Sequence, residues 1–459
     1  MKIRLFERHR GKPWWTWLVS IVPFLALCAL IRYYTDDTGV TVLAVNSYEV
    51  VDWLMQESLD LLVNSNAIAS MFNTEVQKEF EKDFAPGETV RVKYPQEYLI
   101  RDGMSYTAQP HSRRHTDVTC NQIFGIDFDY DSFELAVKME RGEEAIRREY
   151  IAPAVAQMNQ EIESRCALYA YQNASTLVGV LATDPTSFDA SSAAARQKLV
   201  ELGCPPGKDR AIFVPPSVMR VLKNTSLSYF NPVTDLTKQF RTGIVGSGDG
   251  FDWYESVALY SHTAGTWAAG VTINGANQSG ATLTITATAA DTFKKGDKFS
   301  IANVNPVNPR TRRRVGASAK TFTVLNDPQL VAAGGGVDIL QISPAIFGPG
   351  SQYQNVDALP ANAAALTLWP GTGTPNGKSG TVSLALHPDA FALVAVEFDN
   401  PKPGSVQISK QLKDEDTGLT ISFVRAFEPR ERRWINRFDT CIGFGRLWSD
   451  NCAVAIAGA

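Results

Sequence analysis

The sequence lacks the short motifs that mark most enzyme classes. It has no GxSxG, no HExxH, no GxxxxGK[ST], and no GxGxxG between a strand and a helix. Histidine, the commonest general base, occurs only five times in 459 residues. No convergent set of reactive residues emerges. The sequence therefore predicts no catalytic residue, no cofactor site and no metal site.

A basic excess and a cysteine framework are also missing. The 44 basic residues are outnumbered by 48 acidic ones, for a net charge of −4. A dedicated nucleic-acid binder usually carries the opposite balance, gathered on one face. The six cysteines are scattered without a CxxC, so free and mostly buried thiols are expected rather than disulfides.

Three polar patterns admit a binding role, but each has a simpler explanation. His111 and His115 lie four residues apart on an expected loop tip, where a solvated polar surface is the simpler reading. Asp127, Asp129 and Asp131 resemble the start of a calcium loop, but no glycine turn or closing glutamate follows. Two arginine groups could contact phosphate or could be solvated: Arg310, Arg312, Arg313 and Arg314, and then Arg430, Arg432 and Arg433.

The first 40 residues differ from the rest. A basic start precedes an apolar run over residues 14–31, which is just long enough to cross a bilayer and has three tryptophans at one end. Two interpretations stay open. The run is a membrane-targeting leader, or it is appended by a wrongly assigned start, with Val40 or Val42 as the initiating position.

The following segments predict helices and one long hairpin. Residues 47–64 have the apolar spacing of an amphipathic helix with Ser47 as N-cap. Residues 89–100 and the alternating run 126–131 indicate the two legs of a β-hairpin over 87–130 that reaches away from the core. In the return leg, Ile126, Phe128 and Tyr130 alternate with aspartates, so one face is acidic and is available to a neighbouring chain.

Further along, helices and short strands alternate. A long helix is expected up to residue 173, with Pro153 at a kink or in a first turn. A second helix covers 191–202, with a cap near Asp189 and a stop at Gly203. A buried strand at 210–214 and a helical turn at Pro215–Pro216 follow, and His387–Pro388 is expected to open a helix through Val396. This mixture predicts an α+β class.

Composition changes between residues 264 and 380. This stretch is rich in Gly, Ala, Thr, Asn and Pro, and β-prone runs cover 281–287, 298–304, 321–325 and 337–342. Short strands separated by turn signals predict a small β-barrel or sandwich. The simplest organisation is a β-module inserted into a discontinuous α+β domain.

Seven short segments follow one another along the chain: GIVG at 243–246, GFDWYE at 250–255, FKKGDKFSI at 293–301, VNPVNP at 304–309, ISPAI at 342–346, YQNV at 353–356 and LHPDAF at 386–391. They resemble segments that occur in the same order in P22-type tailed-bacteriophage coat proteins. The resemblance runs from about Val42 to the C-terminus. It departs from the family in two places: the leader has no counterpart, and residues 274–280 are short and uncharged where the family's type member has a long charged loop that clasps a neighbouring capsomer.

The resemblance implies the HK97-type phage capsid fold with an inserted β-barrel domain. After the leader, 1–40, it implies an N-terminal arm at 41–86, an extended hairpin loop at 87–131 and a spine helix at 132–175. The axial and peripheral core would comprise 176–263 and 381–459, and the inserted domain 264–380. The implied function is that of a major capsid protein, which assembles as hexamers and pentamers into a shell around double-stranded DNA.

An assembly interface is expected at the hairpin. Its candidate residues are Arg101, Asp102, Arg113, Arg114, Asp127 and Asp129. The implied partners are further copies of the chain, a scaffolding protein and a portal, with DNA enclosed but not read, and assembly is expected in the bacterial host cytoplasm. Two other classes stay open: an encapsulin-like compartment shell and a membrane-anchored bacterial surface protein.

Overall fold

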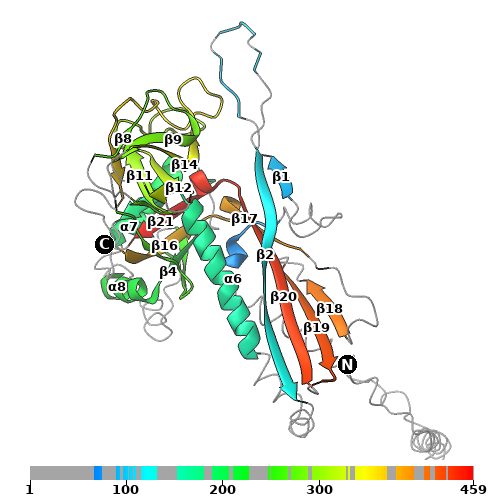
Figure 1. Ribbon diagram of the computed structural model, residues 1–459. Helices are drawn as coiled ribbons and strands as arrows, with labels where there is room; N and C mark the ends of the chain where they lie inside the picture. Colours follow the sequence, from blue (N-terminus) through cyan, green and yellow to red (C-terminus); the bar gives the residue numbers. More distant parts are fainter. Residues whose placement is uncertain are drawn as a thin grey trace, which may run out of the picture. The chain divides into compact units, whose positions relative to one another are not determined.

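The structure is a computed structural model that describes most of the chain after residue 66 (Figure 1). The described residues are 67–74, 89–93, 97–101, 103–106, 108–109, 115–131, 152–179, 189–205, 210–226, 247–248, 250–266, 270–287, 292–326, 329–330, 336–369, 379–396, 398, 408–413, 419–430 and 433–457. All of them belong to one compact unit, Ser58–Ala459. The leader and the helix expected at 47–64 lie outside the described residues. None of the helices described here is both long and apolar enough to cross a membrane.

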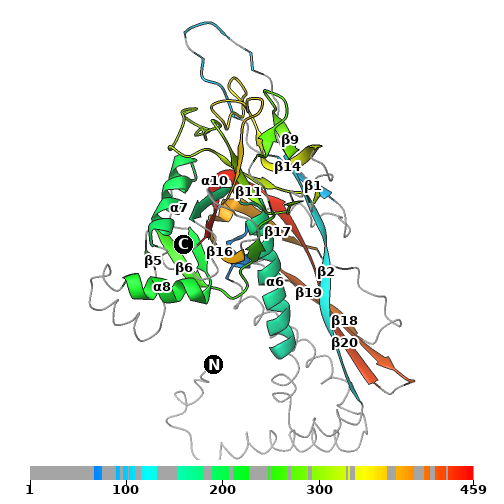
Figure 2. The same cartoon turned by 60° about the vertical axis from the view of Figure 1, so that its left-hand side comes forward.

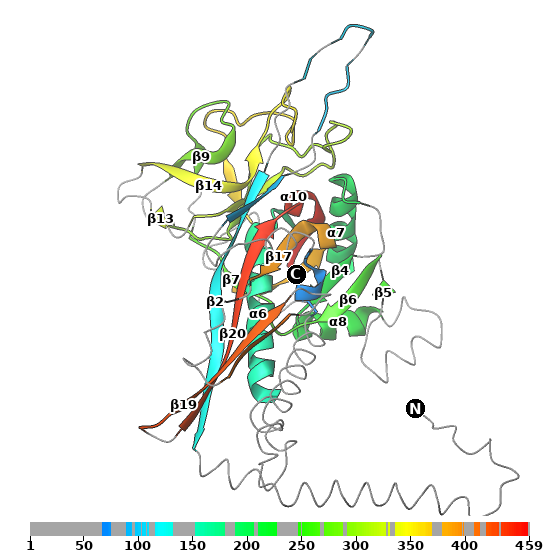
Figure 3. The same cartoon turned by 90° about the vertical axis from the view of Figure 1, so that its right-hand side faces the viewer.

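A long antiparallel sheet is built around two extended strands. Its order is β1 (Thr89–Lys93), β2 (His115–Asp131), β20 (Arg433–Arg446), β19 (Thr420–Glu428) and β18 (Ile408–Lys413), and β17 (Phe391–Ala395) also pairs with β20. Figure 3 shows β2 and β20 side by side along their length. The alternation of Ile126 and Phe128 with aspartates fits this sheet, because alternate residues of a strand face opposite sides.

The structure refines the expected hairpin. β1 and β2 pair from Thr89 opposite Thr119 to Lys93 opposite His115, which forms the base of a hairpin. From Thr119 to Asp131, β2 pairs along its other edge with β20. The acidic run is therefore part of a sheet strand and not of a projecting arm.

Helix α6 (Ala152–Asn173) packs against this sheet. Pro153 lies in its first turn, where the missing N–H is not needed. Tyr169 stacks on Phe444 of β20 with ring centroids 4.9 Å apart, and the Arg165 guanidinium lies 4.2 Å above the Phe124 ring of β2. These contacts hold the helix alongside the strands, and Figure 1 shows α6 running beside β2 and β20.

A second, mixed sheet joins distant parts of the chain. Its order is β3 (Thr176–Gly179), β21 (Ala453–Ala457), β16 (Ser379–Leu386), β4 (Ala211–Val214), β6 (Phe251–Glu255) and β5 (Ser247–Gly248), with β7 (Ser261–Thr263) also paired to β16. Helices α7 (Asp189–Glu201) and α8 (Pro216–Ser226) lie next to each other beside it (Figure 2). The expected strand, both helices and the stop at Gly203, whose φ is +82°, are confirmed.

Between β7 and β16 the chain forms a closed β-barrel. The strands follow the order β15 (Leu366–Leu368), β11 (Lys298–Ile301), β12 (Thr321–Val324), β14 (Gly336–Ile346), β9 (Gly280–Ala287) and β8 (Thr272–Ile273). A bridge from Thr272 to Ala365 joins the two end strands, so the sheet closes on itself. β10 (Thr292–Phe293) and β13 (Gln329–Leu330) form a separate pair. Each of the four β-prone runs contributes a strand.

One expected element is wrong. His387 does not open a helix through Val396: Pro388–Ala390 form only a single 3₁₀ turn, η3, and β17 begins at Phe391. All five residues of β17 are buried. A short, uniformly apolar run has no periodicity to separate a buried strand from a buried helix, and the sheet register with β20 decides the outcome. The remaining short elements are η1 (Ala69–Met71) and α10 (Ser449–Cys452).

Candidate assembly surface

The segment between β1 and β2 exposes large apolar side chains. Ile100, Met104 and Tyr106 are 87 to 99% exposed, and Tyr98 is 61% exposed. Figure 1 traces the described part of this segment past the ends of the two strands. Large apolar groups exposed this close together are uncommon on a monomer, and such patches are typical of protein interaction sites.

The same segment has internal order. The Gln109 side chain accepts from the Leu99 N–H at 2.8 Å and donates back to the Leu99 carbonyl at 2.5 Å, which ties the two legs together. Arg101 donates through Nη1 to the carbonyls of Gly103 (2.5 Å) and Ser105 (2.8 Å). Arg101 thus holds the turn while its side chain stays at the surface. Asp102, Arg113 and Arg114 lie outside the described residues.

Two arginines of β20 face the acidic side of β2. Asp129 accepts from Arg433 at 2.8 Å, and Asp127 lies 3.7 Å from Arg437, which also contacts Asp439 at 2.6 Å. Asp439, and more weakly Asp127, raise the pKa of Arg437. Asp127 and Asp129 therefore have partners within their own chain, and both side chains stay at least half exposed.

The other arginine group also has an in-chain contact. Arg312, with φ of +54°, donates to the carbonyls of Ser351 (2.9 Å) and Gln352 (2.6 Å) within the barrel. Arg310, by contrast, lies at the rim of a pocket of about 470 Å³. Tyr98 and Ile100, at the root of the hairpin segment, also line this pocket. Its shape therefore depends on where the hairpin lies.

A buried lysine fastens the barrel to the end of α6. The Lys298 ammonium, at the start of β11, donates to the carbonyls of Tyr171 (2.9 Å) and Ala174 and to the Thr323 hydroxyl (3.2 Å). It also lies 4.6 Å above the Tyr171 ring. A cation at a helix C-terminus satisfies free carbonyls and complements the helix dipole. Burial lowers the pKa of Lys298 to about 7, against the opposing effect of Asp297.

A second buried polar contact lies next to Lys298, at the joint where the barrel meets the end of α6. His262, on β7, contacts the Asp297 carboxylate through Nε2 at 2.8 Å. Asp297 also accepts from the backbone N–H groups of Gly265 (3.2 Å) and Lys294 (2.8 Å). A buried charge with several donors is stabilised in one position. The joint therefore fixes how the chain passes from the core into the barrel.

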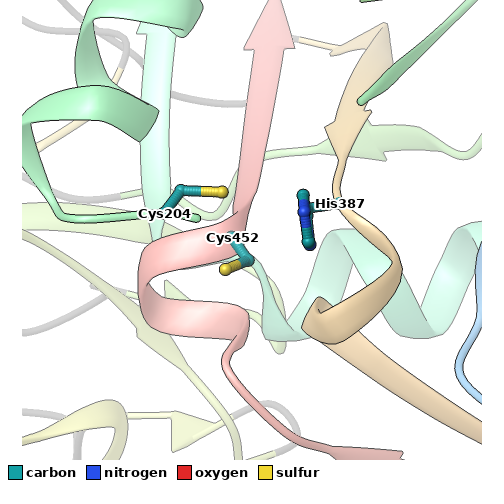
Figure 4. A group of neighbouring side chains, drawn as sticks. All are labelled: Cys204, His387 and Cys452. Carbon is teal, nitrogen blue, oxygen red and sulfur yellow. The ribbon is translucent and has the colours of Figure 1, made fainter. Parts of the chain in front are cut away.

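The five described cysteines are free and buried, as expected, but four of them approach another cysteine. Cys204, Cys452 and His387 form one group, with one donor atom of each within 4.8 Å of the others (Figure 4). Hydrogen bonding from Cys452, together with the nearby Arg210, lowers the pKa of Cys204 despite burial.

This Cys–His–Cys group is a weak candidate for a metal site. His387 Nδ1 accepts from the Asp389 N–H at 3.2 Å, where it caps the 3₁₀ turn, so this nitrogen already has a structural role. The Arg210 cation beside Cys204 opposes a second positive charge. We therefore assign no metal ligands here. The sequence could not reveal the group because its members come from three distant segments.

Comparison with known proteins places the chain in a family. A family model described as P22 coat protein, gene protein 5, matches residues 43–443. The chain belongs to the P22 coat protein family, and it is a major capsid protein of a tailed bacteriophage, which is a structural protein. No curated protein matches it.

Solved structures are similar at low sequence identity. A structure titled Mycobacterium phage Che8 has 12% identity and a TM-score of 0.43, covering 85% of this chain and 91% of that one. The capsid structure of cyanophage P-SCSP1u has 10% identity and a TM-score of 0.41, covering 86% and 88%. The mature capsid of bacteriophage PhiM1 has 11% identity and a TM-score of 0.38, covering 86% and 87%.

Proposed function

We propose that the chain adopts the HK97-type fold and assembles as hexamers and pentamers into a closed icosahedral shell around double-stranded DNA. The observation that carries the assembly mode is the exposed apolar segment between β1 and β2. Burying three or four such side chains against a neighbour stabilises each contact by several kcal/mol, on the order of 2 kcal/mol per side chain. Repeated heterologous contacts of this kind close into rings, and rings tile a shell.

Charges at the hairpin set the register of this contact in our proposal. Arg101 and Asp102, together with Arg113 and Arg114, meet charges of the adjacent subunit. Asp127 and Asp129 contribute through their half-exposed carboxylates, which can accept further donors beside their own arginines. Charged residues at the edge of an interface disfavour incorrect alignments of the two subunits more than they increase binding affinity.

The remaining partners follow from the same proposal. The near-neutral, slightly acidic chain encloses DNA without reading its sequence, since a strongly basic lumen would hold the packaged genome. Assembly takes place in the host cytoplasm with a scaffolding protein and a portal. The barrel supports the fold of the subunit through the Lys298 and Asp297 contacts and takes part in contacts within or between capsomers.

Electron microscopy of the expressed protein tests this proposal. The full chain and a chain that starts at Val40 are each expressed with and without a scaffolding protein and examined in negative stain. We expect closed shells or tubes studded with capsomers from the shorter chain. Soluble monomers under all conditions contradict the proposal, and membrane-bound full chain that never forms shells favours the anchored surface protein.

Charge reversal tests the register. Arg101→Glu is expected to reduce the yield of closed shells at least tenfold, because it removes both the turn-holding contacts and the rim charge. Arg430→Glu is the matched control, since Arg430 is exposed but distant in sequence from the hairpin. A normal yield of closed shells from Arg101→Glu would show that Arg101 does not contribute to the interface.

A further inference from the structure

Two cysteines that are 321 residues apart meet inside the long sheet. The Sγ atoms of Cys120 on β2 and Cys441 on β20 lie 3.1 Å from each other. Both side chains are fully buried. A disulfide bond is about 2.05 Å long, so a closure of about 1 Å would bring the sulfurs to bonding distance. Small rotations of the two side chains can supply such a movement.

The backbone places both thiols on one face of the sheet. Cys120 is opposite Gly443, two residues beyond Cys441 on β20, and residues two apart on a strand share a face. A Cβ at Gly443 would lie only 2.7 Å from the Cys120 Cα, so the glycine permits the close approach of the two strands. The register shifts between Cys120 and Gln122, which draws Cys120 towards Cys441.

The surroundings of the pair are apolar. Val118, Val394 and Val396 pack around the two cysteines, and Val92 and Phe398 cover the cluster. Among the described residues, the potential metal ligands that come together are Cys204, His387 and Cys452, and this cysteine pair is not among them. Two adjacent thiols in an apolar setting can react with each other to form a disulfide.

We propose that Cys120 and Cys441 are an oxidative modification site, at which the folded chain forms an intrachain disulfide when it meets a hydroperoxide. The Cys441 thiolate attacks one peroxide oxygen, the O–O bond breaks, and a sulfenic acid and water result. The Cys120 thiol then attacks the Cys441 sulfur and releases its proton, the S–O bond breaks, and the departing hydroxide takes this proton and leaves as a second water. In total, two thiols and one hydrogen peroxide give one disulfide and two waters.

The order of the two thiols follows from their hydrogen bond. Either sulfur can be the donor of this hydrogen bond; with Cys120 as the donor, the contact lowers the pKa of Cys441, while the same contact and burial raise the pKa of Cys120. Cys441 is therefore the first nucleophile, since the thiolate is the reactive form. Burial limits access, so we expect the reaction to be slow and to favour a small oxidant.

The disulfide would join the strand that carries the hairpin to the longest C-terminal strand. Because it closes a loop of 321 residues, it restricts most of the unfolded chain. For a shell assembled in a reducing cytoplasm and released outside, such a bond would form after assembly and slow the loss of subunits. This consequence rests on the proposed function, but the disulfide itself does not.

Peptide mapping of the full chain tests the site. Protein purified with reductant is transferred to hydrogen peroxide, remaining thiols are alkylated, and the unreduced digest is analysed by mass spectrometry. We expect a reductant-sensitive peptide pair that links Cys120 to Cys441 and faster migration on a non-reducing gel. Cys441→Ala abolishes this pair, whereas the control Cys204→Ala leaves it intact.

Three outcomes would overturn the proposal: full alkylation of both cysteines after peroxide, recovery of Cys120 or Cys441 as separate sulfinic acids, or links of either to another cysteine. If Cys441→Ala fails to fold, the test uses the wild-type chain only. Its urea unfolding midpoint must rise after peroxide treatment and return to the starting value after reductant is added. Electron microscopy of the same samples separates the two proposals, since mapped disulfide without shells contradicts only the proposed function.

Discussion

The barrel and the long sheet stabilise themselves in different ways. The barrel closes through Thr272 and Ala365 and surrounds an apolar core that includes Phe293, Phe299 and Phe322, all fully buried. The long sheet ends in β1 and β18, carries half-exposed ion pairs and continues into the exposed apolar hairpin segment. Among the described residues, the barrel sheet therefore closes on itself, whereas the long sheet has two end strands and continues into a segment with exposed apolar side chains.

The largest effect is expected in the barrel core. Phe299→Ala removes a fully buried ring that contacts Phe322 at 5.8 Å between centroids, and it should destabilise the chain by about 3–5 kcal/mol. Urea unfolding of the purified chain measures this. Val337→Ala, at a side chain 62% exposed on the same barrel, should change stability by less than about 0.5 kcal/mol. Equal losses in the two variants would show that the barrel core is not packed as described.

A smaller but still large effect is expected where β2 approaches β20. In Gly443→Ala, the new methyl group would meet the Thr119 carbonyl oxygen at 2.6 Å, so the strands must separate. We expect a loss of about 1–3 kcal/mol in unfolding free energy. The control is Gly336→Ala on β14, where the added carbon would have no neighbour within 4 Å. A Gly443→Ala variant as stable as its control contradicts the close strand approach.

The joint between barrel and helix should respond to pH. The pKa of Lys298 is about 7 in the folded chain and near its ordinary 10.5 when unfolded. Between these values the unfolded chain binds more protons, so stability rises with pH. From pH 7 to 9, the wild type should gain on the order of 2 kcal/mol relative to Lys298→Met. Urea unfolding at both pH values measures the difference, and a constant difference would mean that Lys298 stays charged throughout.

The smallest effect is expected at the ion pair between the long strands. The Asp129–Arg433 contact is half exposed, and such pairs contribute about 0.2–1 kcal/mol. A double-mutant cycle with Asp129→Asn and Arg433→Gln measures the coupling free energy, which added salt should reduce. A coupling above about 2 kcal/mol would show that the pair is shielded from water.

Sequence patterns predicted local structure well where the pattern had a clear period or a clear stop. The stop at Gly203 and the alternation in β2 are local signals, and the structure confirms both, while the helix expected at 191–202 begins at Asp189. The uniformly apolar β17 had no such period and was mistaken for a helix.

Contacts between distant segments lie beyond what a single sequence shows. The arginines that pair with the β2 aspartates, and the cysteine that meets Cys120, are about 300 residues away. The role of Lys298 was also missed, because a lysine at the start of a strand gives no sign that a helix end will lie above it.

The most direct test is a high-resolution reconstruction of assembled particles by electron cryomicroscopy. We expect Tyr98, Ile100, Met104 and Tyr106 to be buried against an adjacent subunit, while the register of β2 and β20 stays as it is in the single chain. Particles in which these four side chains face solvent, with no neighbouring subunit over them, would contradict this expectation.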